Sequence, residues 1–334
     1  MSLPETYKAL ISNEQGELSL KEFPLPKPST NQVLVKVAYA PINPSDIAKL
    51  KGFYGKSQDY TTTLRGSEGS GIIVAVGNDL TIPYKVDDRV HIKRETWGEY
   101  MLAESEDINR ILQDDLSMEE AACHFVNPAT VYYMAILVKK GNHKAVIHTA
   151  GSSAIGRMMI RYFKHKGLKL INIVRREEVI EELKKEGAYI VLNSKADDFE
   201  EKLKEVAEKE GATVCFESIV GDMTGKILKN MPENSTVHIY GALSDLTINK
   251  LGVSEFIFQG KSVTGFWLGP YIQQVFKREG GAEVFQKTRK EVLDLLPNLL
   301  SSPIMKVFDL EKIDEALEFN DKNSSKGKTL LKLN

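Results

Sequence analysis

The pattern of hydrophobic and polar positions changes its period near residue 144. Before that point, the chain carries short runs rich in β-branched residues, such as residues 33–39 and 71–77, bounded by Pro, Asn and Gly. Runs of this length with these boundaries are typical of β-strands. They predict a small β-barrel or sandwich in the first part of the chain.

From Lys144 onward, apolar runs alternate with longer amphipathic segments. The first strand is predicted at Ala145 to His148, and a helix begins near Ile155 with its apolar residues on one face. Further strands are predicted at 170–174, 189–192, 213–216, 236–240 and 262–266, and helices in the charged segments 177–186 and 197–210. This alternation predicts a doubly wound parallel sheet with helices on both faces.

After Gly269 the pattern becomes mixed, with a helix predicted within 282–300 and short strands at 304–308 and 329–333. A length of 334 residues predicts two domains. We therefore expect an α/β protein in which residues 1–125 begin a catalytic domain and 126–268 form a nucleotide-binding domain. Residues 269–334 are expected to return to the first domain.

Composition and charge narrow the classes of partner. The formal charge of -2 provides no global field for nucleic acid or an anionic membrane, and no apolar run is long enough to span a bilayer. Only Cys123 and Cys215 are present, far apart, so no disulfide framework is predicted. The start of the chain has no presequence pattern. We expect a soluble intracellular protein, cytoplasmic unless a mitochondrial presequence has been removed.

A turn of small residues follows the first strand of the predicted parallel sheet. Gly151 and Gly156 stand at the first and third glycine positions of the dinucleotide fingerprint, and Ser153 at the second. Such a turn presents backbone N–H groups and the positive end of a helix to a pyrophosphate, although it can also serve packing alone. The candidate residues of this turn are Gly151, Ser152, Ser153, Ala154, Ile155 and Gly156.

Two arginines stand where an NAD-specific fold carries an acidic residue. Arg175 and Arg176 follow the second predicted strand, about 20 residues past the fingerprint. A carboxylate there would repel a ribose 2′-phosphate, whereas guanidinium groups donate paired hydrogen bonds to it. The pair therefore favours NADPH over NADH, with two solvated surface arginines as the alternative.

The segment from Arg65 to Gly71 resembles the medium-chain dehydrogenase/reductase superfamily, whose zinc-containing members carry Gly-His-Glu there. In this chain Ser67 replaces the histidine ligand, and Asn43 stands where those members have a cysteine ligand. The four-cysteine structural lobe is missing, and the six histidines form no pair at i, i+4. Because neutral Ser and Asn are poor zinc ligands, no zinc is predicted.

Within that superfamily, residues 41–47 and 52–55 closely resemble the mitochondrial trans-2-enoyl thioester reductases. Further matches lie at 126–132, 239–242 and 265–268 and at Lys328, so the resemblance covers nearly the whole chain. It implies that Tyr54 is the catalytic proton donor. A phenol stays protonated at neutral pH and can donate to the α-carbon after hydride reaches the β-carbon. Without the motif, a tyrosine that only packs in a glycine-rich loop would be the simpler interpretation.

The same resemblance implies a GroES-like β-barrel catalytic domain, a Rossmann domain that binds NADPH, and homodimers formed through the edges of the two nucleotide-binding domains. It implies that the cofactor is lined by the turn, both arginines and a further set of residues. That set is Asn127, Tyr240, Gly241, Ala242, Leu243, Phe266, Trp267, Leu268, Gly269 and Lys328. Two departures are Ala154, where a glycine is usual, and Glu177, which directly follows the arginines.

Three functions follow from these residues. The first is NADPH-dependent reduction of trans-2-enoyl thioesters, in which the acyl group is carried by coenzyme A or by an acyl carrier protein. The second is a quinone or alkenal reductase of the same superfamily, and the third is a non-catalytic, crystallin-like NADPH-binding protein. Surface bases such as Lys93, Arg94, Lys277 and Arg278 are candidates to receive a carrier, with scattered solvated charges as the alternative.

Overall fold

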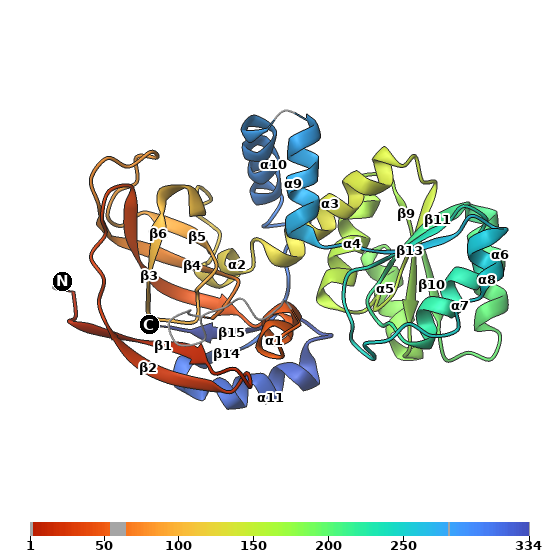
Figure 1. Ribbon diagram of the computed structural model, residues 1–334, viewed down its shortest axis with the longest axis horizontal. Coiled ribbons are helices and arrows are strands. Elements are labelled where there is room, and N and C mark those ends of the chain that lie inside the picture. Colours follow the sequence, from red (N-terminus) through yellow and green to blue (C-terminus); the bar gives the residue numbers. More distant parts are fainter. Residues whose placement is uncertain (1–2, 54–64, 280, 334) are drawn as a thin grey trace. The chain divides into compact units, whose positions relative to one another are not determined.

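The computed structural model describes residues 3–53, 65–279 and 281–333 (Figure 1). The chain divides into two units. Unit 1 combines residues 1–127 with 296–334, and unit 2 comprises residues 128–295. Tyr54, the predicted proton donor, lies outside the described residues.

Within the described residues, unit 1 is built on a seven-stranded sheet with the order β14-β15-β3-β4-β5-β7, and β6 also pairs with β3. Its strands are β3 (Gln32–Pro41), β4 (Glu68–Val76), β5 (Arg89–Lys93), β6 (Tyr100–Glu104), β7 (Ile108–Arg110), β14 (Ile304–Asp309) and β15 (Lys328–Lys332). A separate antiparallel pair joins β1 (Thr6–Ser12) and β2 (Leu18–Pro24). The short helices are α1 (Pro44–Leu50), α2 (Met118–Ala122) and α11 (Ile313–Asn323), with 3₁₀ turns at η1 (Ser105–Asp107) and η3 (Leu310–Lys312).

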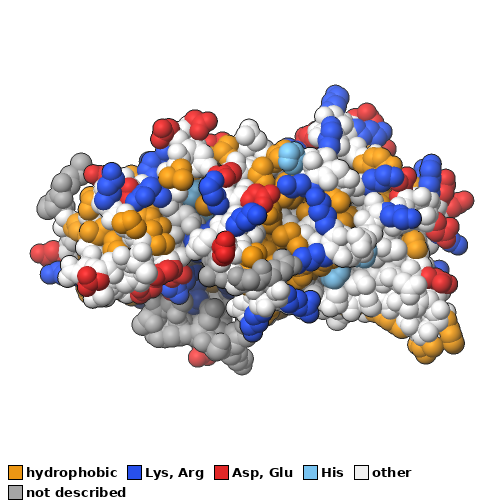
Figure 2. Space-filling model, turned by 90° about the horizontal axis from the view of Figure 1, so that it is seen from above, with side chains coloured by type: hydrophobic (Ala, Val, Ile, Leu, Met, Phe, Trp, Pro, Cys, Tyr) orange, Lys and Arg blue, Asp and Glu red, His pale blue; other side chains and the backbone are white. Residues whose placement is uncertain are grey.

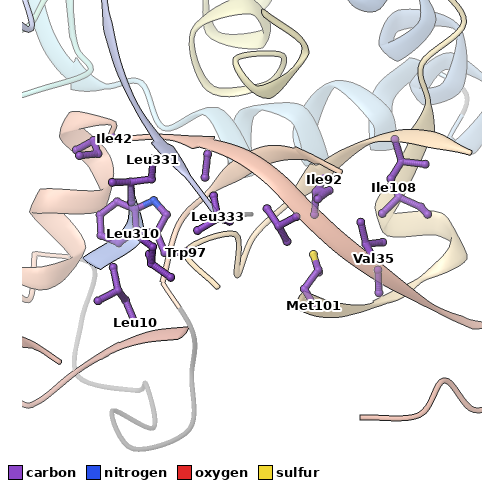
Figure 3. Packing of buried hydrophobic residues seen from close by; sticks show 14 of the residues in the cluster. Leu10, Val35, Ile42, Ile92, Trp97, Met101, Ile108, Leu310, Leu331 and Leu333 are labelled. Carbon is purple, nitrogen blue, oxygen red and sulfur yellow. The ribbon is translucent and has the colours of Figure 1, made fainter. Parts of the chain in front are cut away.

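The end of the chain completes the sheet of unit 1. β15 pairs antiparallel with β3, with Leu330 opposite Pro41, and parallel with β14. Figure 3 shows how Leu331 and Leu333 of this last segment pack with Trp97, which is fully buried, and with Leu10. The strands predicted at 304–308 and 329–333 are thus present, and they contribute to the same core as the first part of the chain.

Unit 2 is built on a six-stranded parallel sheet with the order β10-β9-β8-β11-β12-β13. Its strands are β8 (Ala145–His148), β9 (Lys169–Val174), β10 (Ile190–Asn193), β11 (Ala212–Glu217), β12 (Thr236–Ile239) and β13 (Ser262–Gly265). Its helices are α3 (Val126–Lys140, which starts in unit 1), α4 (Ala154–His165), α5 (Ile180–Glu186, after the 3₁₀ turn η2, Glu177–Val179), α6 (Phe199–Glu210), α7 (Asp222–Asn230), α8 (Val253–Ile257), α9 (Leu268–Glu279) and α10 (Ala282–Asp294). The predicted strands are confirmed, each shifted by no more than one or two residues.

The helices cover both faces of this sheet, α4 and α5 on one side and α6 and α7 on the other (Figure 1). The strand order reverses between β8 and β11, which makes the carboxyl ends of these two strands the topological switch point. Ligands of doubly wound sheets bind at this position. The candidate site is therefore expected at the carboxyl edge of β8 and β11.

The return to unit 1 begins later than residue 269, where the sequence pattern placed it. Residues 269–295 belong to unit 2, because α9 and α10 are attached to its first helices. The rings of Tyr271 and Tyr133 lie 6.2 Å apart, and the Tyr132 hydroxyl donates to Glu291 over 2.7 Å. These long-range contacts leave no local signal in the sequence.

In the described part of the chain, no helix combines the length and the apolar character that a membrane span requires.

Candidate functional site

The turn between β8 and α4 has the geometry of a phosphate-binding loop. Ser153 caps α4, and its Oγ accepts a hydrogen bond from the Gly156 N–H at 3.1 Å. A Cβ at Gly156 would lie 2.4 Å from the Gly151 carbonyl oxygen, so only glycine permits this approach of helix to turn. Ala154, at a position where glycine is usual, is buried. The N-terminus of a twelve-residue helix therefore opens at the switch point.

A buried carboxylate organises the neighbouring loop. Glu217 ends β11 and is fully buried, and it accepts hydrogen bonds from the N–H groups of Ile219 and Val220 at 2.6 and 2.9 Å. The hydroxyls of Thr149 and Thr224 donate to the same carboxylate at 3.2 and 2.8 Å. Thr149 follows β8, so Glu217 joins the two loops of the switch point. The sequence pattern did not identify Glu217, because a single acid at the end of a strand has no distinguishing local signal.

Tyr240, one of the predicted cofactor residues, is held by a buried histidine. Its hydroxyl lies 2.7 Å from Nε2 of His148, and its backbone N–H donates to the Glu217 carbonyl oxygen at 3.0 Å. Burial lowers the pKa of His148 to about 3 and raises the pKa of the Tyr240 phenol. A neutral imidazole and a protonated phenol are thus the stable pair, and they fix the start of the 240–243 segment.

The arginine pair follows β9, as the sequence placed it. Arg175 is exposed, and among the described residues it forms no ion pair, while Nε of Arg176 lies 3.9 Å from Glu178. Asn193, at the end of β10, donates to the Glu177 carboxylate at 2.6 Å. The acid that follows the arginines is therefore paired with a neighbouring strand end rather than with the guanidinium groups.

The remaining candidates of unit 2 also follow carboxyl strand ends. Residues 241–243 continue from β12, and the Leu243 N–H donates to the Ser218 carbonyl oxygen at 2.8 Å. Residues 266–269 continue from β13, with Phe266 buried and Trp267 60% exposed. The structure thus places the turn, the arginines and both later segments along one edge of the sheet. Asn127, in the first turn of α3, and Lys328, at the start of β15, belong to unit 1.

Unit 1 contains a buried cluster of charged and polar side chains around Glu68. Its carboxylate accepts hydrogen bonds from the Phe125 and Val126 N–H groups at 2.7 and 3.0 Å, and from the Asn43 amide at 3.0 Å. The Lys328 ammonium donates to the Asn43 amide oxygen. Burial raises the pKa of Glu68, and the charge of Lys328 partly opposes that rise. The four donors are the side chains of Asn43 and Lys328 and the backbone N–H groups of Phe125 and Val126. They come from both segments of the chain that form unit 1.

Ser67 takes part in a second, adjoining set of hydrogen bonds. Its hydroxyl donates to the buried carboxylate of Asp46 and accepts from Lys49 at 2.7 Å. Gly66, just before it, has a φ of +93°, and a Cβ there would meet the Thr96 hydroxyl at 2.4 Å. This glycine lets the chain turn so that Ser67 and Glu68 face the cluster.

These side chains do not fit a zinc ion. The Asn43 amide is engaged at both ends, its nitrogen to Glu68 and its oxygen to the ammonium of Lys328. Ser67 is equally engaged, and burial raises the pKa of the nearby Cys123 thiol to about 12, which disfavours the thiolate that zinc binds. Within the described residues, no group of three His, Cys, Asp or Glu side chains is placed to hold a metal ion. The ammonium of Lys328 supplies the positive charge of this cluster.

Comparison with known proteins establishes the superfamily. Residues 29–112 match the alcohol dehydrogenase GroES-like domain, and residues 154–280 match the zinc-binding dehydrogenase domain. With the two sheets described above, these matches confirm the predicted fold class, a GroES-like β-barrel domain plus a Rossmann domain. The chain belongs to the medium-chain dehydrogenase/reductase superfamily of oxidoreductases.

Curated relatives include mitochondrial enoyl-[acyl-carrier-protein] reductases. The protein of Caenorhabditis elegans is 30% identical over 78% of this chain and 76% of its own length, and the human protein is 26% identical over 98% and 89%. The predicted resemblance to this group is thus confirmed. Among solved structures, an inferred NADPH:quinone reductase from Mesorhizobium loti has a TM-score of 0.84 and 31% identity over 99% of this chain and 100% of its own. A mutant enoyl thioester reductase from Candida tropicalis shares the fold, with a TM-score of 0.81 and 21% identity over 98% and 99%.

Proposed function

We propose that this protein reduces the carbon–carbon double bond of trans-2-enoyl thioesters with NADPH. The observation that carries the proposal is that Asn43, at the position of a zinc ligand, is hydrogen-bonded to Glu68 and Lys328. Conjugate reduction needs a hydride and a proton, whereas alcohol oxidation in zinc-containing members uses a metal-bound oxygen. The names of the curated relatives support an enoyl thioester substrate and a mitochondrial compartment.

In this proposal the residues of unit 2 bind the cofactor. NADPH, when bound, supplies the hydride for the β-carbon. The turn from Gly151 to Gly156 presents the N-terminus of α4 to the pyrophosphate, and Gly156 lets the helix approach the turn closely. Arg175 and Arg176 donate to the 2′-phosphate, and Tyr54 delivers the proton to the α-carbon.

A substrate panel tests the proposal. We expect NADPH oxidation with short and medium enoyl thioesters, at a kcat/KM well above that for a quinone or a free enal, and a clear preference for NADPH over NADH. Discrimination is measured as the ratio of these constants. A higher kcat/KM for the quinone would overturn the assignment.

A quinone reductase is the second candidate, because the Mesorhizobium loti protein carries that description at 31% identity. It would share the fold and the cofactor residues but would need no site for the carrier of a thioester. Binding of NADPH without turnover of any acceptor in the panel would instead support a non-catalytic, crystallin-like protein. The three functions therefore predict three different outcomes of one experiment.

We expect Arg175→Ala and Arg176→Ala to raise the KM for NADPH while leaving the KM for NADH almost unchanged. A hydrogen bond from a charged donor is worth about 1.5 to 3 kcal/mol, which corresponds to roughly ten- to a hundredfold per residue. Steady-state kinetics with both cofactors checks this, and NADH is the internal control because it lacks the 2′-phosphate. Equal effects on both cofactors would contradict the role of the arginines.

A homodimer is proposed through the outer edge of β13, which pairs only with β12 among the described residues and ends the unit 2 sheet. The Lys261 N–H donates to the Glu255 carbonyl oxygen and so holds α8 beside β13, where Val253, Ile257 and Phe258 are exposed. An unpaired strand edge flanked by apolar side chains is suited to pairing with a second copy.

We expect Phe258→Glu to weaken the dimer by at least about a hundredfold, because each of the two copies would lose an apolar contact worth about 1.5 to 3 kcal/mol. Sedimentation at several concentrations measures this. Leu112→Glu, an equally exposed apolar position in unit 1, is the matched control. A wild-type protein that sediments as a monomer at all concentrations would contradict the proposal.

A further inference from the structure

An open groove of about 530 Å³ runs along α9, entirely within unit 2. It begins at the end of β13 and continues past the first turns of the helix to its basic end. Figure 2 looks onto the side of the molecule where α9 and α10 are uppermost, and basic side chains lie next to hydrophobic ones there. The lining residues are Gly265, Phe266, Trp267, Pro270, Tyr271, Gln273, Gln274, Lys277 and Arg278.

The polar lining comes from one face of α9. Ile272 and Val275 are buried, whereas the four polar residues of this helix that line the groove are exposed. They are Gln273, Gln274, Lys277 and Arg278, which form two pairs at i, i+4. Residues with this spacing lie one above the other, so two amides are followed by two cations along the helix axis. From Leu268 to Arg278 the helix rises by about 15 Å.

The cations at the end of the groove are not neutralised by acids. Among residues 3–53, 65–279 and 281–333, no ion pair is formed by Lys277 or Arg278, whereas Lys169 and Lys202, which are also exposed in unit 2, each have an acidic partner. Lys140, at the end of α3, lies close enough to Arg278 that burial and this like charge both lower the pKa of Lys140. Lys277 and Arg278 thus place two positive charges at this end of the groove, which favours an anionic ligand.

This charge is separate from the proposed site of the cofactor 2′-phosphate. Arg175 and Arg176 follow β9, whereas the groove starts at β13, four strands away in the sheet. At about 4.8 Å per strand, the ends of β9 and β13 are about 19 Å apart. Arg278 lies near Lys140 of α3, whereas Arg176 lies near Glu178, so the two pairs of cations have different neighbours.

We propose that this groove binds the 4′-phosphopantetheine arm through which the acyl group of the substrate is carried. The inference rests on the proposed function and names the part of the substrate that α9 recognises. The arm has a thioester at one end, two amides along its length and a phosphate at the other. In the same order, the groove has the aromatic residues Trp267 and Tyr271, then two glutamine amides, then two cations. Coenzyme A and acyl carrier protein share this arm.

Charge reversal tests the assignment. We expect Lys277→Glu/Arg278→Glu to raise the KM for an enoyl-CoA and for an enoyl acyl carrier protein by about ten- to a hundredfold. The KM for the same acyl group on pantetheine or on N-acetylcysteamine, which lack the phosphate, is expected to stay within about twofold. Lys277→Gln/Arg278→Gln is the milder variant, because it removes the cations without placing acids at the C-terminal end of a helix.

The matched control is Lys204→Glu/Lys209→Glu on α6, which changes the net charge equally at exposed positions outside the groove. A comparable rise in KM in this control would show that overall charge is responsible and would overturn the proposal. An effect on the CoA thioester but not on the carrier protein thioester would assign the cations to the nucleotide phosphates of CoA, and an effect on the carrier protein alone would assign them to its surface acids. Either result would also overturn it.

Direct binding tests the inference independently of turnover. The chain has two tryptophans, Trp97 in the core of unit 1 and Trp267 in the groove, so the emission of the exposed indole reports on the groove. We expect 4′-phosphopantetheine to change this emission in the wild type, and at least about tenfold higher concentrations to be needed in the Lys277→Glu/Arg278→Glu variant. In the Trp267→Phe variant this change in emission should disappear, which identifies Trp267 as its source. If no enoyl thioester is reduced, the proposed function fails, whereas a titration without saturable, charge-dependent binding refutes the groove assignment itself.

Discussion

Tyr54→Phe is expected to lower the kcat for an enoyl thioester by about a hundred- to ten-thousandfold, because positioned proton transfer contributes that range to a rate. Phenylalanine keeps the ring and removes only the hydroxyl that is proposed to protonate the α-carbon. The KM for NADPH should change little, since the arginines and the glycine turn, not Tyr54, are proposed to hold the cofactor. Single-turnover measurement of NADPH oxidation separates the chemical step from product release.

Tyr189→Phe is a suitable control for this substitution, since Tyr189 is about half exposed and lies in unit 2. It should leave the rate unchanged. A Tyr54→Phe variant with the full wild-type rate of the chemical step would remove Tyr54 from the mechanism. In that case protonation by water or by another group would have to be considered, although the cofactor assignment would be unaffected.

Lys328→Met is expected to reduce the free energy of unfolding by about 3 to 5 kcal/mol, which is the usual cost of leaving a buried charge without its partner. Lys328 is 4% exposed, and Glu68, whose carboxylate it helps to compensate, is fully buried. Methionine has a similar length and no charge, so packing is largely kept. Denaturant unfolding of the apoprotein measures the loss without any dependence on activity.

Adding Glu68→Gln to Lys328→Met should recover a large part of this loss. The double variant has no buried charge at this place, and the Asn43 amide, released from Lys328, can turn its oxygen to the new amide while the Phe125 and Val126 N–H groups keep an acceptor. A double-mutant cycle gives the coupling energy between the two residues. Additive losses would show that Lys328 and Glu68 do not interact.

The same pair predicts a pH dependence. Burial already raises the pKa of Glu68 in the folded state, and loss of the Lys328 charge raises it further. A carboxyl group with a raised folded-state pKa is protonated in both states below about pH 4, and its cost appears as pH rises through the folded-state pKa. Relative to the double variant, Lys328→Met should therefore lose stability as pH rises from about 4 towards neutral.

The period of the apolar residues was sufficient to place the strands of unit 2 and the helices α4, α5, α6 and α10, but it did not predict α3, α7, α8 or α9. The strand 145–148 and the helix that starts at residue 154 follow from local pattern, because a parallel strand buried on both faces must be apolar throughout. The boundary between the two units near residue 295 could not be predicted from this pattern, because it depends on contacts that Tyr132 and Tyr271 make with residues on other helices. Contacts between residues far apart in sequence have no period that a single chain displays.

The candidate site likewise contains residues that the sequence predicted and residues that it did not. The glycine turn and the two arginines were found from residue type and spacing, since a tight turn needs glycine and a phosphate needs donors. Glu217 and His148 were not, because a single acid or histidine at a strand end has no distinguishing local signal. Their importance comes from the hydrogen bonds that join the loops after β8, β11 and β12.

The sequence by itself determined the class of fold, the loss of two zinc ligands and the cationic character of the position after β9, because each depends only on residue identity and local spacing. The tertiary structure decided which side chains surround the positions of the lost zinc ligands. It also decided which residues lie beside the surface cations Lys277 and Arg278. Lys328 meets Asn43 across 285 positions of sequence only because β15 closes the sheet beside β3. Lys277 and Arg278 share a groove with Trp267 only because α9 presents one face to solvent, and burial and convergence of charge are properties of the folded chain.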